Sequence, residues 1–378
     1  MKNPAIVIVA YNREKPFIRL LKSLGKAIYY DFDVPLIISI DKGGSERIIN
    51  ISENYVWEHG TKKIIRHTQH LGLKDHLISC GDLSKEYGHV IILEDDLMVS
   101  QFFYDYAVKS INWFDTASIM GISLYSPRHN IYTNYPFIPI EDGFDNFYIQ
   151  MPQTWGQIWG KETWSSFKKW FENEEYLRKL DKSYPIFIDK WSDKSYAKYI
   201  WQYMVEEDLY FVIPRTSFTT QFGEFGTNFN QAVTHFQRPL SIGTQEFKFS
   251  TFEKSNSKYD SHYELFPEII SKFNDEFEER SFIMDINGSK IINPNEDRYI
   301  VTTKPMKRPL REYALQMKPP ELNIINKIEG EGINYGTSYE ITKVRQFRKK
   351  IHNFSWDDYY FRKLTSKRLL GLILRKLF

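Results

Sequence analysis

The stretch HVIILEDDLMV, residues His89–Val99, decides the fold class of this chain. Its first five residues are mostly apolar and β-branched, a pattern typical of a strand buried in a parallel sheet. Three carboxylates follow at once, at Glu94, Asp95 and Asp96. Like charges a few ångströms apart raise each other's pKa, so the triplet is costly to hold together without a cation. At the carboxyl end of a strand it predicts a divalent metal and a phosphorylated ligand; the alternative is a strand that ends in a solvated acidic turn.

Strand and helix patterns alternate through the N-terminal part of the chain. Apolar and β-branched runs predict strands at Ala5–Ala10, Leu36–Ile40, Lys63–Arg66 and Val90–Leu93. Helical spacing is present at Lys15–Leu24, Ile48–Glu58 and Lys74–Tyr87. This alternation predicts an α/β fold, with a doubly wound, mainly parallel, Rossmann-like sheet and right-handed crossovers.

Polar residues follow these strands at the point where each strand ends. Tyr11, Asn12 and Arg13 follow the first strand, Asp41 follows the second, and the acidic triplet follows the fourth. The carboxyl ends of parallel strands meet at one edge of the sheet, where such folds bind nucleotides. Neither G-x-G-x-x-G after the first strand nor G-x-x-x-x-G-K-[S/T] occurs in the sequence. The NAD-type fingerprint and the P-loop are therefore excluded.

Composition narrows the class of protein further. The 378 residues suffice for two domains, and a hydrophobic share of 42% excludes wholesale disorder. A net charge of +2 gives no drive toward nucleic acid, so no such partner is expected. The single cysteine, Cys80, excludes an internal disulfide framework and fits a reducing compartment. The apolar run Ala5–Ala10 is too short for a signal peptide, and no apolar stretch reaches spanning length, which predicts a cytoplasmic protein.

The character of the sequence changes along the chain and suggests its domains. We predict a first domain over residues 1–240, with a nucleotide-binding half at 1–100 and a second half at 101–240. Residues 241–378 are predicted to form an α-rich extension that ends in a basic amphipathic helix at 362–378. Such a helix suits the anionic inner face of a membrane, and the alternative is a terminal helix packed on its own domain or on a partner.

Several motifs in a fixed order resemble one enzyme family. They are A-Y-N-R at Ala10–Arg13, the strand-end Asp41, H-x-G at His70, the Glu94–Asp96 triplet, W-G-x-x-W-G-x-x-x-W at Trp155–Trp164, and P-x-x-S at Pro214–Ser217 before Phe222-Gly223. This order resembles the nucleotide-sugar glycosyltransferases of the GT-A fold. The triplet is similar to the EDD form of the DxD motif in N-acetylglucosaminyltransferase I and related bacterial enzymes. The resemblance covers about residues 4–236, and the last third of the chain matches no family motif.

The resemblance implies that residues 101–240 form the acceptor half of the first domain, and it implies a role for each matching residue. Asp41 would contact uridine, Asp95 the ribose or diphosphate, and Trp155 with Gly156 the sugar or acceptor. Asp96 would hold Mn²⁺ or Mg²⁺, which neutralises a departing diphosphate. His235 is a second candidate near the metal, its alternative being a surface-loop histidine. The further candidates for nucleotide binding are Ala10, Tyr11, Asn12, Arg13, Lys74 and Glu94.

The catalytic base is the part that the sequence specifies least. Inverting transfer needs a carboxylate that deprotonates the acceptor hydroxyl. Related enzymes carry it between the Trp-Gly segment and the P-x-x-S strand, which leaves as candidates Asp189, Asp193, Glu206, Glu207 and Asp208. We predict Asp193 ahead of Asp189, although Asp193 could instead cap the helix that starts near Ser195.

These observations predict a metal-dependent, inverting hexosyl- or N-acetylhexosaminyltransferase. The donor would be a nucleotide sugar, UDP-linked, and the acceptor a saccharide or lipid-linked glycan in bacterial surface polysaccharide synthesis. One alternative is a nucleotidyltransferase, which would normally show a glycine-rich basic loop where this chain has Ala10–Arg13. The other is a carbohydrate-binding protein on an inactive transferase fold.

Overall fold

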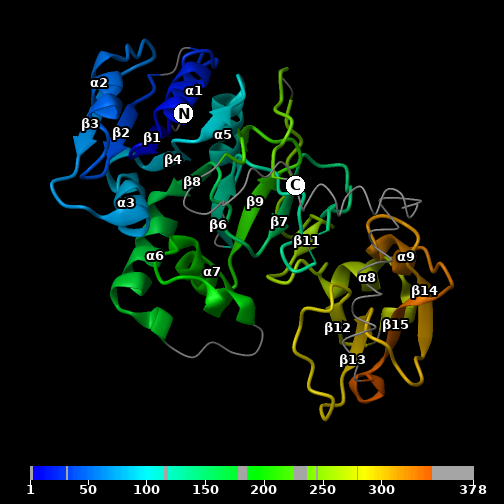
Figure 1. Cartoon of the computed structure of the whole chain (residues 1–378). Coiled ribbons are helices and arrows are strands. Elements are labelled where there is room, and N and C mark those ends of the chain that lie inside the picture. Colours follow the sequence, from blue (N-terminus) through cyan, green and yellow to red (C-terminus); the bar gives the residue numbers. More distant parts are fainter. Residues whose placement is uncertain are drawn as a thin grey trace, which may run out of the picture. The chain divides into compact units, whose positions relative to one another are not determined.

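The computed structural model describes residues 3–30, 33–114, 118–133, 135–177, 185–224, 236–243, 246–278 and 280–342. The chain divides into two compact units (Figure 1). Unit 1 comprises Met1–His129 and Phe137–Ile269, and unit 2 comprises Asn130–Pro136 and Ile270–Phe378. Residues 241–269, which the sequence analysis grouped with the extension, therefore belong to unit 1. The predicted helix at 362–378 and His235 lie outside the described residues.

Four parallel strands form the N-terminal half of the sheet in unit 1. They are β1 (Ala5–Ala10), β2 (Leu36–Ile40), β3 (Lys62–Arg66) and β4 (His89–Glu94), in the order β4-β1-β2-β3. Val9 lies opposite Glu94 and Ala10 opposite Ile40, so the three central strands end at the same level. The predicted strands and the predicted α/β class are confirmed. The sequence could predict them because a run of apolar residues buried on both faces is typical of a strand inside a parallel sheet.

The other half of the sheet is mixed. Its strands are β6 (Ile119–Ser123), β7 (Asn146–Ile149), β8 (Gln157–Gly160), β9 (Tyr210–Pro214) and β11 (Lys258–Tyr259). The full order is β11-β7-β9-β6-β8-β4-β1-β2-β3. β8 runs antiparallel between β4 and β6, and β7 runs antiparallel to β9. The start of β8 therefore lies at the edge of the sheet where β4 and β6 end.

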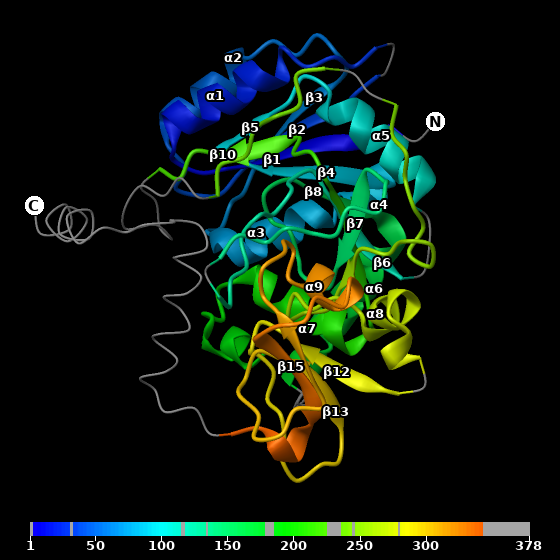
Figure 2. The same ribbon diagram turned by 90° about the vertical axis from the view of Figure 1, so that its right-hand side faces the viewer.

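Helices cover both faces of this sheet. They are α1 (Glu14–Leu24), α2 (Glu46–Asn54), α3 (Gly72–Gly81), α4 (Ser84–Tyr87), α5 (Phe103–Trp113), α6 (Lys161–Glu172) and α7 (Tyr196–Glu206), with the 3₁₀ turns η1 (Glu175–Leu177) and η2 (Ile186–Lys190). Figure 2 shows α1, α2 and α5 over one face of β1–β4 and α3 over the other. Ile6 and Ile8 are two residues apart, so they lie on the same face of β1, and both belong to the core that also contains Phe17 and Tyr104.

A short two-stranded ribbon joins distant segments beside the end of β4. β5 (Leu97–Val99) pairs antiparallel with β10 (Thr219–Gln221), with Thr219 opposite Val99 and Gln221 opposite Leu97. Since β5 follows the acidic triplet directly, this pairing brings residues 222–224 next to the triplet.

Unit 2 is built around a four-stranded sheet in the order β12-β13-β15-β14. Its elements are β12 (Phe282–Asp285), β13 (Tyr299–Thr302), β14 (Arg311–Ala314), β15 (Gly332–Thr337), α9 (Glu321–Ile325), η3 (Asp275–Phe277) and η4 (Ser338–Glu340), while α8 (Pro267–Phe273) leads into it from unit 1. The prediction of an α-rich extension is therefore wrong for the described residues. The strands are four to six residues long and pair with distant partners, so they leave little periodicity to detect.

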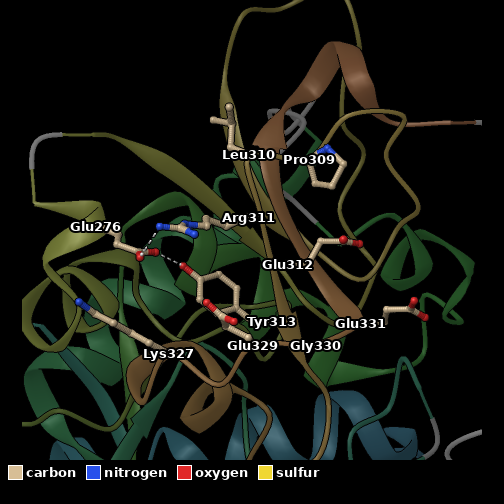
Figure 3. A pocket seen from close by; sticks show the side chains of 10 residues that line it. All are labelled: Glu276, Pro309, Leu310, Arg311, Glu312, Tyr313, Lys327, Glu329, Gly330 and Glu331. Carbon is tan, nitrogen blue, oxygen red and sulfur yellow. Dashed lines mark hydrogen bonds and ion pairs between the residues drawn. The ribbon is translucent and has the colours of Figure 1, made fainter.

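A cavity of about 400 Å³ lies in unit 2 beside β14 (Figure 3). On one side, Glu276 accepts a hydrogen bond of 2.6 Å from the Tyr313 hydroxyl and lies 3.4 Å from the Arg311 guanidinium. The segment Lys327–Glu331 forms another side. The contacts of Glu276 fasten η3 to β14.

No helix within the described parts of the chain is long and apolar enough to cross a membrane.

Candidate active site

The acidic turn, which we define as Glu94, Asp95 and Asp96, begins at the last residue of β4 and leads into β5 at the carboxyl edge of the sheet. Parallel pairing with β1 sets Tyr11–Arg13 beside it, because both strands end at this edge. The backbone N–H of Tyr11 donates a hydrogen bond to Asp95. The Tyr11 ring is partly exposed, and its centroid lies 5.7 Å from that of His70. Residues far apart in the sequence thus meet where the sequence analysis predicts a nucleotide site.

Arg13 is the residue of the first strand end that contacts the acidic turn most closely. Its Nη1 lies 2.5 Å from Asp96 Oδ2, and its Nη2 lies 3.9 Å from Glu224 Oε2. Burial lowers the pKa of the guanidinium, but the charges of Asp96, Asp95 and Glu224 outweigh burial and raise it overall. Arg13 therefore stays charged and neutralises one of the three carboxyls.

The remaining two carboxyls are poorly neutralised. Burial, reinforced by Asp96 and Asp95, raises the pKa of Glu94 to about 8, against the opposing effects of Arg13 and a hydrogen bond to Tyr196. Burial and the charge of Asp96 raise the pKa of Asp95 to about 7, while Arg13 and the Tyr11 N–H oppose that rise. Near neutral pH the turn must therefore hold protons or take up a cation.

Asp96 offers an oxygen that suits a cation. Its Oδ1 is buried and has no hydrogen-bond partner within the described residues, whereas Oδ2 is held by Arg13. A buried acceptor without a partner is uncommon in native proteins, and Mn²⁺ or Mg²⁺ favours such a carboxylate oxygen. The described side chains include no group of three or more metal-ligating residues. A divalent ion here would accordingly need oxygens from its substrate, as Mg²⁺ sites commonly do.

Tyr196, at the start of α7, holds Glu94 from the other side. Its side chain is hydrogen-bonded to Glu94, and its hydroxyl accepts a 3.0 Å hydrogen bond from Gln157 Nε2. Gln157 Oε1 in turn accepts from Trp159 Nε1 at 2.9 Å. Neither Tyr196 nor Gln157 could be identified as a site residue from the sequence, because the antiparallel pairing of β8 with β4 places Gln157 here and Tyr196 on α7 reaches Glu94 only in the folded chain.

Arg19 and Glu224 form a second pair beside the turn. Arg19 Nη1 lies 2.8 Å from Glu224 Oε1, and Nη2 lies 3.4 Å from the backbone oxygen of Asp96. The Arg19 guanidinium also stacks 3.6 Å from the ring centroid of Phe222. The hydrogen bond from Arg19 lowers the pKa of Glu224. In the sequence, only the Phe222-Gly223 motif lies near this pair, and it includes neither Arg19 nor Glu224.

Asp41 is placed at the end of β2 but is engaged by the protein itself. Its side chain is 4% exposed, Oδ1 accepts from the N–H groups of Lys42 and Leu71 at 2.8 Å, and Oδ2 accepts from Gly72 N–H at 2.9 Å. Burial raises the pKa of Asp41, but these N–H groups outweigh it and hold the pKa below its ordinary value. Asp41 thereby fixes the start of α3, and its contact with uridine stays a prediction.

Trp155 and Gly156 are tied to β10. Thr219 Oγ1 donates to the Trp155 carbonyl at 2.5 Å, and the Trp155 ring packs 4.9 Å from Tyr125 and 5.1 Å from Phe236, centroid to centroid. Gly156 has φ +93°, and a Cβ there would lie 2.8 Å from Thr219 Cγ2. Glycine is therefore required both by conformation and by space. Their role under a sugar stays a prediction.

No hydrogen bond or ion pair links the two predicted bases or Lys74 to the acidic turn within the described residues. Asp193 is 84% exposed and pairs with Lys198 Nζ at 2.7 Å, which lowers its pKa. Asp189 is exposed in η2, and neither carboxyl forms a hydrogen bond or ion pair with the acidic turn among the residues described. Asp193 does not cap α7, whose N-cap is Ser195. Lys74 Nζ lies 5.2 Å from the ring centroid of Tyr199 on α7, so it faces that helix.

Comparison with known proteins gives weak similarities. No family model and no curated protein matches the chain. A structure of S. aureus TarS 1-349 in complex with UDP-GlcNAc aligns over 61% of each chain, with 13% identity and a TM-score of 0.41. GalNAc-T7 with UDP, GalNAc and Mn²⁺ aligns over 62% of this chain and 47% of its own, with 12% identity and a TM-score of 0.42.

A third structure is the mannosyltransferase PcManGT from Pyrobaculum calidifontis in complex with GDP-Man and Mn²⁺. It aligns over 42% of this chain and 45% of its own, at 8% identity and a TM-score of 0.31. In each case the alignment spans less than two thirds of the compared chain. The assignment of a reaction to this protein accordingly rests on its own residues.

Proposed function

We propose that this protein is a metal-dependent glycosyltransferase of GT-A type that uses a nucleotide-sugar donor, UDP-linked. The observation that supports this most is the state of Asp96. One of its oxygens is neutralised by Arg13, and the other is buried with no partner among the described residues, at the carboxyl edge of the sheet, where open α/β sheets bind their ligands. A solvated acidic turn would leave both oxygens of Asp96 open to water, whereas Oδ1 is buried.

The residues around the turn suit a nucleoside diphosphate. The partly exposed Tyr11 ring offers a face for a base, and Arg13 offers a fork for phosphate oxygens. Asp96 would hold Mn²⁺ or Mg²⁺, and the ion, when bound, supplies Lewis-acid neutralisation of the leaving diphosphate. Tyr196 and the Tyr11 N–H keep Glu94 and Asp95 oriented. The acidic turn thus offers one Asp96 oxygen as a metal ligand, while the protein fixes the other two carboxyls.

The transfer itself would proceed with inversion. The bond between the anomeric carbon and the diphosphate breaks while the acceptor oxygen attacks the opposite face of the sugar, and a carboxylate takes the proton of the acceptor hydroxyl. Asp193 is the proposed base. Its ion pair with Lys198 at 2.7 Å lowers its pKa, which makes it a weaker base than an unpaired carboxylate. The acceptor is proposed to be a saccharide or a lipid-linked glycan.

A thermal-shift screen tests the proposal directly. Nucleoside diphosphates and nucleotide sugars should raise Tm when Mn²⁺ is present, because a ligand that binds the native state stabilises it by mass action. Asp96→Ala should lose this shift and all Mn²⁺-dependent release of UDP, while its own Tm stays close to that of the wild type. Full UDP release by Asp96→Ala would remove Asp96 from the mechanism, and stabilisation without any turnover would favour a carbohydrate-binding protein.

A further inference from the structure

We infer that Arg13 is an exchangeable counterion, which occupies the cation position of the acidic turn until metal and diphosphate arrive together. The inference rests on the proposed function and adds an order to it: the divalent ion binds well only with the nucleotide. Three steps support it, concerning the charge of the turn, the two oxygens of Asp96, and the second acceptor within reach of Arg13.

The first step is the charge balance. The acidic turn carries three carboxyls, and Arg13 is the cationic side chain within ion-pair distance of them in the described structure. Arg19, the next arginine, donates a hydrogen bond to the backbone oxygen of Asp96, and its guanidinium forms an ion pair with Glu224. A guanidinium cannot release its proton at any ordinary pH, so the neutralisation that Arg13 provides can end only by movement.

The second step is the asymmetry of Asp96. The Arg13 Nη1 contact of 2.5 Å occupies Oδ2 and leaves Oδ1 buried without a partner in the part of the chain that is described. An ion at Oδ1 would be bound to the same carboxylate as the guanidinium. Two cations this close repel strongly in a partly buried site, so the ion alone should bind weakly. The diphosphate changes this balance because it adds negative charge beside both cations.

The third step is that Arg13 has other acceptors within reach once it leaves Asp96. Its Nη2 lies 3.9 Å from Glu224 Oε2, which also accepts a hydrogen bond from Arg19 Nη2 at 3.1 Å, and both side chains are partly exposed, at 28% for Arg13 and 40% for Glu224. Glu224 stays ionised because Arg19 lowers its pKa. The guanidinium can therefore leave Asp96 toward Glu224 and toward phosphate oxygens, for which its planar fork is well suited. A single movement of the Arg13 guanidinium therefore releases Asp96 and binds the diphosphate.

The test is the effect of Arg13→Gln on two separate binding equilibria. Binding of Mn²⁺ without nucleotide, followed by electron paramagnetic resonance of the free ion, should tighten about tenfold, because one like charge near the ion is removed. Binding of UDP at saturating Mn²⁺, followed by calorimetry, should weaken about tenfold or more, because a charge-assisted contact is lost. Arg47→Gln is the matched control, since Arg47 is 77% exposed and pairs at 3.2 Å with Glu14 on the surface.

Effects of opposite sign separate this role from a merely structural one. If Arg13→Gln weakens Mn²⁺ and UDP alike, or changes neither, Arg13 does not exchange with the metal and the inference is overturned. Arg13→Lys adds a further check: it keeps the charge, so Mn²⁺ alone should bind as in the wild type while UDP binding falls. The failure of the proposed function looks different, because the wild-type protein would then bind neither UDP nor a nucleotide sugar with Mn²⁺.

Discussion

Glu94→Gln should change how the stability of the metal-free protein depends on pH. The folded protein raises the pKa of Glu94 from its ordinary value of 4.5 to about 8, and that of Asp95 from 3.8 to about 7. Below the ordinary values both carboxyls are protonated in the folded and unfolded chains and have no effect. As pH rises above them, the unfolded chain releases protons that the folded chain retains, so stability falls until the folded pKa is reached.

The size of the effect follows from linkage. One carboxyl that is protonated only in the folded state lowers the free energy of unfolding by about 1.4 kcal/mol per pH unit. For each carboxyl, stability falls over the pH range between its ordinary pKa and its raised pKa. The ranges of Glu94 and Asp95 overlap from pH 4.5 to pH 7. Because Glu94 is not completely removed from solvent, screening reduces its share, and we expect about 1 kcal/mol per pH unit from it in this window. Glu94→Gln keeps the shape of the side chain and removes that share.

Urea unfolding at a series of pH values across this window, with a chelator present, measures the slope for wild type and variant. Glu86→Gln is the matched control, because Glu86 is an exposed carboxyl paired at 3.6 Å with Lys63, and surface pairs contribute little. Mn²⁺ should flatten the wild-type slope, since the ion replaces the protons. Equal slopes for wild type and Glu94→Gln would show that Glu94 is ionised in the folded protein, and the argument for an under-neutralised turn would fail.

Three further predictions address other parts of the chain. Gly156→Ala should destabilise unit 1 by about 1–3 kcal/mol in urea unfolding, because of its positive φ and the 2.8 Å approach to Thr219 Cγ2; an unchanged midpoint would contradict the strain. Asp193→Asn should lower kcat for transfer at least about a hundredfold while UDP binding is kept, and an unaffected kcat would exclude Asp193 as the base. Deletion of residues 362–378 should release the protein from anionic vesicles in a sedimentation assay, and unchanged sedimentation would refute the proposed membrane contact.

The N-terminal half of the sheet could be predicted closely from the sequence. β1 and β2 have the predicted bounds, and β3 and β4 differ by a residue at their ends. The predicted helix at Lys74–Tyr87 is divided into α3 and α4. These elements could be predicted because each is a local pattern, an apolar run or a helical period, repeated within one short segment.

β7 and β8 could not be predicted in the same way. Each has four residues, and Gln157–Gly160 lies in a tryptophan-rich run that leads into α6, so it shows no alternation of apolar and polar residues that would mark a strand. Its strand conformation depends on pairing with β4 and β6, from residues far away in the sequence. The sheet of unit 2 was missed for the same reason, because its strands find their partners only in the folded chain.

The sequence by itself determined that three carboxyls follow a buried strand and that polar residues follow its neighbours, because both facts are local. Only the tertiary structure decided how these groups are balanced. Parallel pairing of β1 with β4 brings Arg13 to Asp96, the β5–β10 ribbon brings Glu224 beside them, and the antiparallel β8 brings the partner of Tyr196. Charge neutralisation depends on distances of a few ångströms between residues remote in the chain, and it is the pairing of distant strands that brings these residues together.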